Sequence, residues 1–100
     1  MADDTLHDVL ARALEAYARL ELLGEDVEDE WTYVTDLEAA WEARLLEVDA
    51  ARGDEPVSPA VETAIDVACD EIARIEDPHR AIDWLSTFPQ VVLVALGEPL

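Results

Sequence analysis

The chain has 100 residues, of which 51% are apolar, and it carries 25 Asp and Glu against six basic residues, for a formal net charge of −19. Disordered acidic segments are poor in apolar residues, so this composition predicts one folded, acidic helical domain over residues 1–100. The six basic residues are all Arg, which excludes direct binding to nucleic acid or to an anionic membrane surface, because both need clustered cations. The charge favours surface cations or a basic protein partner.

The cysteine content and the lack of Lys indicate the cellular environment in which the protein works. The single cysteine, Cys69, excludes an internal disulfide and a zinc site built from cysteines. The acidic N-terminus lacks a basic and apolar leader, and the longest apolar run, 91–96, is far shorter than a membrane span, so we expect a cytoplasmic protein. An Asp/Glu-rich, Lys-free and Ala-rich composition resembles the proteins of extreme halophiles, where concentrated salt screens self-repulsion.

Two amphipathic helices are predicted in the first half of the chain. The first spans 5–23, with Asp4 or Thr5 as its N-cap, and Gly24 ends it. The second spans about 29–52 and ends at Gly53, after an acidic connector over 25–30. Apolar residues at intervals of three and four mark one inner face on each helix, which for the second comprises Trp31, Val34, Leu37, Trp41, Leu45 and Val48.

Cap-and-proline pairs divide the second half of the chain. Ser58 before Pro59 starts a third helix that runs to about residue 76, and Asp77 before Pro78 starts a short fourth helix to about residue 86. The last segment, 89–96, is β-branched enough for a buried strand, but no other segment alternates with period two to pair with it. We therefore predict a fifth, short helix there, and an all-α fold: a compact single-domain bundle of four to five helices.

The candidate chemical groups do not assemble into a predicted active site. His79 ends a Glu-x-x-His pattern, but Pro78 breaks the helix that would carry it, and bundle metal sites need two such motifs. We interpret His7 as a solvated first-turn residue, and we expect acidic neighbours to raise the pKa of the Cys69 thiol and make it less reactive. We expect no enzyme activity, no catalytic or metal-binding residue and no cofactor. The alternative is a small metal-dependent enzyme, which requires His7 and His79 to converge with nearby carboxylates.

Two surfaces are candidates for protein contacts. Carboxylates four residues apart on the third helix form a possible acidic docking face, which consists of Glu62, Asp66, Asp70 and Glu71. The apolar C-terminal segment must be buried on every side, and contact with a second copy of the chain is one way to bury it. The possible interface comprises Trp84, Phe88, Val91, Val92, Leu93 and Val94.

The sequence therefore predicts a non-enzymatic protein-interaction or regulatory module with a halophile-type acidic surface. Its partner is another protein or a second copy of the chain, which would form a homodimer through the C-terminal helix. The alternative is a DNA-mimic inhibitor that occupies the basic groove of a nucleic-acid-binding protein, which requires carboxylates clustered like phosphates on one surface.

Overall fold

Four helices make up the fold. The computed structural model describes the backbone of residues 5–26 and 28–99 and the side chains of residues 5–26 and 38–99. The helices are α1 (Leu6–Gly24), α2 (Glu28–Arg52), α3 (Pro59–Ala73) and α4 (Pro78–Ala95). This described part contains no strand, only one isolated bridge between Thr5 and Pro56. The predicted all-α bundle is confirmed, with four helices.

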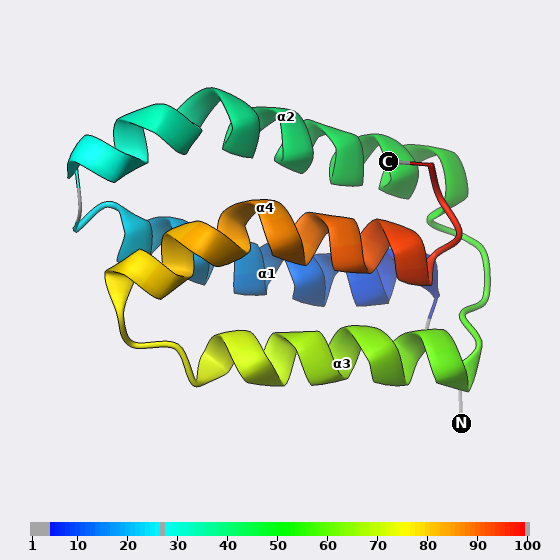
Figure 1. The fold of residues 1–100 in the computed structure, drawn as a ribbon. Helices are drawn as coiled ribbons and strands as arrows, with labels where there is room; N and C mark the ends of the chain where they lie inside the picture. Colours follow the sequence, from blue (N-terminus) through cyan, green and yellow to red (C-terminus); the bar gives the residue numbers. More distant parts are fainter. Residues whose placement is uncertain (1–4, 27, 100) are drawn as a thin grey trace.

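The helices form a flat bundle around a central pair. Helices α1 and α4 lie side by side in the middle, α2 packs against both on one side, and α3 packs against both on the other (Figure 1). Helices α2 and α3 do not touch each other in the described part, and the molecule measures 44 × 25 × 17 Å. Each outer helix is therefore held by two neighbours, whereas α1 and α4 are each held by three.

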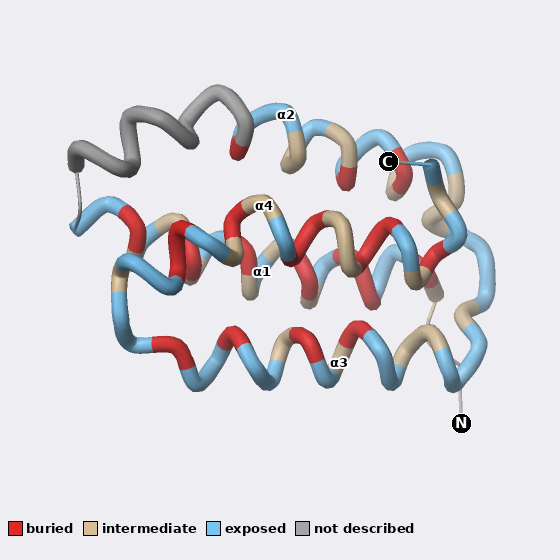
Figure 2. The backbone as a smooth tube through the Cα atoms, in the orientation of Figure 1, coloured by how far each residue is buried: buried red, intermediate tan, exposed pale blue. Residues whose placement is uncertain are grey.

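The core follows this arrangement. Buried residues concentrate on α1 and α4 and on the faces of α2 and α3 that point toward them (Figure 2). None of the helices, over the described residues, is long and apolar enough to cross a membrane. The inner-face residues Trp31, Val34 and Leu37 lie outside the described side chains, while Leu45 and Val48 are buried as predicted.

The caps that define the helix starts are those expected from the sequence. The Thr5 side chain accepts from the Asp8 N–H while the Asp8 carboxylate accepts from the Thr5 N–H, which is a capping box. Ser58 and Asp77 cap α3 and α4, each followed by a proline in the first turn. At the other end of α4, Gly97 adopts a φ of +74°, and the Glu98 N–H donates to the Leu93 carbonyl at 2.9 Å. This Schellman motif stops the helix at Gly97.

The predicted division of the C-terminal region into two helices is wrong, because residues 78–95 form one continuous helix that passes through Pro89. The third helix also ends at Ala73, three residues earlier than predicted. Proline inside a helix removes one backbone donor and kinks or breaks the helix unless the surroundings compensate. The sequence pattern alone placed a separate helix over 89–96, whereas Pro89 lies inside a continuous helix.

Tyr17 provides this compensation. An N–H at position 89 would donate to the carbonyl four residues earlier, that of Leu85, and proline has none. The Tyr17 hydroxyl donates to that Leu85 carbonyl at 2.7 Å, in a fully buried position. The Tyr17 ring also stacks on Phe88 with centroids 6.5 Å apart. One side chain of α1 therefore satisfies the carbonyl that Pro89 leaves open and packs beside it.

We predict that Tyr17→Phe lowers the free energy of unfolding by about 1–3 kcal/mol, because it leaves a buried carbonyl without a donor. Urea denaturation measures this loss. In a Pro89→Ala background the residue 89 N–H can donate to Leu85, so the same Tyr17→Phe change should cost clearly less. An equal cost in both backgrounds would contradict the pairing of the hydroxyl with the proline.

Candidate functional site

The apolar C-terminal segment is covered by its own chain. Phe88, Val92 and Leu93 are fully buried within the bundle, because α4 contacts all three other helices. Trp84 and Val91 are half-buried, and Val94 is 63% exposed. Of the six residues expected at an interface, only these last three present surface to a partner.

The outer side of α4 is a neutral strip on an acidic molecule. Residues 84–97 contain no charged residue, the longest such stretch in a chain that is 31% charged. Several positions of this stretch keep exposed surface along α4, Ser86 and Ala95 among them. We call five of them, which follow helical spacing, the neutral face: Trp84, Thr87, Gln90, Val91 and Val94. Charged residues resume on either side, at Asp83 and Glu98.

The acidic face predicted on α3 is partly neutralised. Arg12 of α1 lies 3.6 Å from a Glu62 oxygen and 3.4 Å from an Asp66 oxygen. Glu71 pairs with Arg74 at 3.6 Å, and Asp70 is exposed. Two of the four carboxylates therefore face a guanidinium that joins α1 to α3, which lowers the negative potential of this face.

Other arginines also join separate elements. Arg19 of α1 donates to the Ile72 carbonyl at 2.6 Å, where its positive charge also meets the C-terminal end of α3. Arg44 and Arg52 of α2 both donate to the Glu98 carboxylate, at 3.1 and 2.6 Å, and lower the pKa of Glu98. Arg52 donates in addition to the Leu96 carbonyl at 3.1 Å. Such multiple bonds suit the forked guanidinium better than an ammonium.

The two histidines are not brought together. The first turn of α1, which carries His7, and the first turn of α4, which carries His79, lie at opposite ends of the bundle (Figure 1). The His79 backbone N–H donates to the capping Asp77 carboxylate. The convergence that a metal-dependent site on both histidines requires is therefore absent from the described structure.

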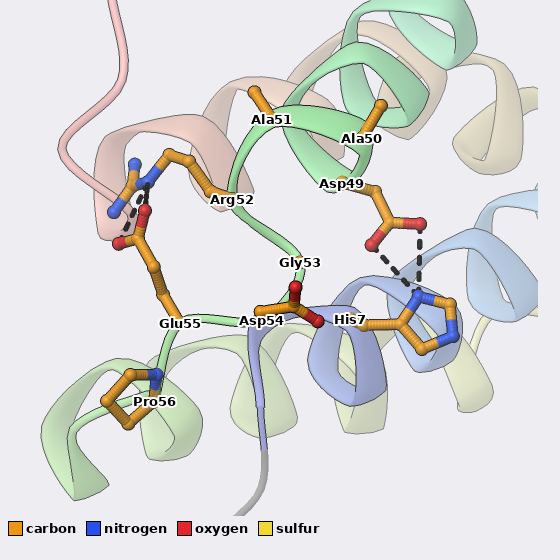
Figure 3. Close-up of a pocket in the computed structure, with 9 residues that line it drawn as sticks. All are labelled: His7, Asp49, Ala50, Ala51, Arg52, Gly53, Asp54, Glu55 and Pro56. Carbon is orange, nitrogen blue, oxygen red and sulfur yellow. Dashed lines mark hydrogen bonds and ion pairs between the residues drawn. The ribbon is translucent and has the colours of Figure 1, made fainter.

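His7 instead forms a pair with Asp49 at the end of α2. Its Nδ1 lies 2.9 and 3.1 Å from the two Asp49 oxygens, beside an open hollow of about 560 Å³ lined by residues 49–56 (Figure 3). The loop holds the histidine in place, because the His7 N–H donates to the Gly53 carbonyl at 3.0 Å. A Cβ at Gly53 would lie only 2.6 Å from the Asp49 carbonyl oxygen, so this close approach requires glycine.

The chemistry of this pair is limited. The hydrogen bond and the charge of Asp49 raise the pKa of His7 above its usual 6.5. A carboxylate that orients an imidazole is one part of a nucleophilic site, but none of the nine residues lining the hollow is Ser, Thr or Cys. Cys69 lies elsewhere, half-buried on α3, and burial raises the pKa of its thiol. The pair joins the first turn of α1 to the last turns of α2.

A cluster of three glutamates between α1 and α2 was missed from the sequence. One carboxylate oxygen from each of Glu21, Glu38 and Glu42 lies within 4.8 Å of the other two, and Glu38 is only 7% exposed. Burial and the hydrogen bond with Glu38 raise the pKa of Glu21 to about 8, and burial and Glu38 also raise that of Glu42. Carboxylate oxygens are ligands for hard cations, but acidic groups alone do not identify a metal site.

Comparisons with protein-family models, curated proteins and solved structures found no match for this chain. The functional argument therefore depends on the residues themselves.

We predict that His7 stabilises the fold in a pH-dependent way. Its pKa is raised in the folded state, so its contribution is fully present below about pH 6.5 and is lost as the pH rises through the higher folded value. Imidazole titration by NMR should show His7 titrating above pH 6.5, and Asp49→Asn should lower that midpoint. A His7 midpoint that Asp49→Asn leaves unchanged would contradict the assignment.

We also predict that Arg52→Lys lowers the urea midpoint at an unchanged m value, because an ammonium cannot reach Glu55, Glu98 and the Leu96 carbonyl together. Arg74→Lys is the matched control, since Arg74 is exposed and makes a single 3.6 Å ion pair within its own segment. An equal decrease of the urea midpoint in the two variants would contradict the role of the Arg52 guanidinium in joining several acceptors.

Proposed function

We propose that this chain is a non-enzymatic protein-interaction module that binds a basic amphipathic segment of another protein on the neutral face of α4. The observation that carries the proposal is the uncharged stretch 84–97, whose outer residues are apolar or uncharged on a chain of net charge −19. Protein interfaces place few charges at their centre and surround it with a polar rim. Trp84 at one end of the face is the residue type most often found as an interface anchor.

The charge of the chain supports a basic partner over a second copy. The field around a molecule of this charge attracts cationic segments and speeds their association. Two copies would each bring a charge of −19 to a shared interface, which opposes pairing unless salt screens it. A partner with apolar residues at helical spacing and flanking Lys or Arg fits the neutral face and its acidic surroundings.

We infer that the rest of the acidic surface keeps the chain dissolved in concentrated salt, as its Lys-free composition suggests. The alternative of a DNA mimic gains no specific support, because Arg12 lies against two of the four carboxylates of the α3 face. A mimic of the phosphate backbone needs that negative charge to remain available to a basic groove.

The test uses a synthetic helical peptide of Leu and Lys at amphipathic spacing, with a Leu and Gln peptide as the uncharged control. We expect the basic peptide to shift NMR resonances of residues 84–97. Val94→Ser should weaken binding about five- to tenfold through lost apolar contact. Val67→Ser on α3 is the matched control, because Val67 is 56% exposed and neither change alters the net charge.

Two results would overturn the proposal. Equal weakening by both serine variants would mean that the peptide binds by charge alone, at no defined face. Light scattering that shows a dimer of the free chain, dissociated by Val94→Ser, would assign the neutral face to a second copy instead.

A further inference from the structure

The Glu21–Glu38–Glu42 cluster brings three acidic side chains together where helices α1 and α2 meet. Glu38 and Glu42 are four residues apart on α2, so they share one face of that helix, and Glu21 lies opposite them on α1. Their oxygens lie within 4.8 Å of one another, and Glu38 is the one charged residue among the described side chains that is buried. Three ionised carboxylates at this separation in a poorly solvated place repel one another strongly.

The groups that act on the pKa values of Glu21 and Glu42 are themselves acidic. On α1, Glu25 raises the pKa of Glu21 further, and the Tyr17 phenol is itself kept neutral by burial and the three carboxyls. Arg19, two residues before Glu21, is engaged with the Ile72 carbonyl of α3. On α4, the third helix packed here, the charged residues of the first turns are all solvent-exposed: His79, Arg80 and Asp83. The causes that shift the pKa of Glu21 and of Glu42 are burial and other glutamates.

A proton resolves this repulsion. When one carboxyl is protonated it donates a hydrogen bond to a neighbouring carboxylate, and two charges are replaced by a charge-assisted hydrogen bond. Glu21 and Glu38 are placed for this arrangement, because a carboxylate oxygen of each lies within 4.8 Å of the other. The pair then has titration steps that belong to the cluster as a whole.

We propose that Glu21, Glu38 and Glu42 form a proton-operated latch, which fastens α2 to α1 while it holds a proton and loosens this contact when the proton leaves. The position of α2 makes the latch effective. Over its described residues this helix packs against α1 and α4 and not against α3, so a repulsion against α1 acts on one of its two supports.

The direction of the pH effect follows from the protons bound. The unfolded chain loses the Glu21 proton near pH 4.5, whereas the folded chain keeps it to about pH 8. Between these values the folded state holds more protons than the unfolded state, so stability falls as the pH rises. The latch is therefore closed at and below neutral pH and opens under mildly alkaline conditions.

Infrared spectroscopy in D₂O tests the latch in the unmodified protein. At neutral pH ordinary carboxyls are ionised, so the C=O band of a protonated carboxylic acid reports the held proton directly. We expect this band at pH 7 and its loss with a midpoint near pH 8. Absence of the band at pH 7 would overturn the proposal.

Glu38→Gln tests which residues hold the proton. The amide keeps the size and a hydrogen-bond donor but removes one charge, so Glu21 should ionise at lower pH and the acid band at pH 7 should disappear. Glu47→Gln, on the same helix but exposed, is the matched control and should keep the band. The raised pKa of His7 also makes stability fall as the pH rises, so a His7→Asn background should be used when thermal midpoints are compared across pH.

The movement itself is measured by electron spin resonance. Spin labels at Ala18→Cys and Ala39→Cys, both exposed positions on α1 and α2, in a Cys69→Ser background report the distance between the helices. The distance distribution should broaden or lengthen between about pH 6 and pH 9, and Glu38→Gln should remove this change. A distribution that is constant with pH, alongside a titrating acid band, would show a held proton without a latch and would overturn the opening step.

Discussion

The bond between the Tyr17 hydroxyl and the Leu85 carbonyl is the constraint on which the rest of the bundle depends. It joins α1 to α4, the central pair against which both outer helices pack. Its presence lets α4 pass through Pro89 without a break, so a single helix of 18 residues can contact all three others. Were α4 to end before Pro89, the buried residues Val92 and Leu93 would lose the helix that places them in the core. One phenol therefore supports the passage through Pro89 of the helix that organises the fold.

The arginines show how so acidic a chain still joins its parts. Charge repulsion within a chain of net charge −19 opposes compaction, and six guanidinium groups are available against it. Arg12 and Arg19 link α1 to α3, and Arg44 and Arg52 link α2 to the chain after α4. These cations lie at junctions between elements, where one guanidinium reaches several acceptors. The absence of lysine is consistent with this use, because a point charge cannot bridge in the same way.

How much was predictable from the sequence depended on the range of the interactions. The starts of α3 and α4 were predicted because Ser58-Pro59 and Asp77-Pro78 act within one turn. Pro89 was misread because its missing donor is replaced by Tyr17, 72 positions away in the chain, and no local pattern shows that. The sequence indicated that residues 91–94 must be buried. It did not indicate what buries them, because the contacts come from three other helices. The glutamate cluster was missed because Glu21 and Glu38 meet only after α1 and α2 pair.

The shortage of cations bears directly on the Glu21–Glu38–Glu42 cluster. Four of the six arginines are engaged at helix junctions, and the contacts of these four do not include the buried group of carboxyls. In a lysine-rich protein the same three glutamates would be expected to hold an ammonium, and their interaction would change little across neutral pH. Here the remaining partner is a proton, and its binding depends on pH in the range where surface carboxyls no longer titrate. The composition that gives the chain its acidic surface thus also makes the α1–α2 contact sensitive to pH.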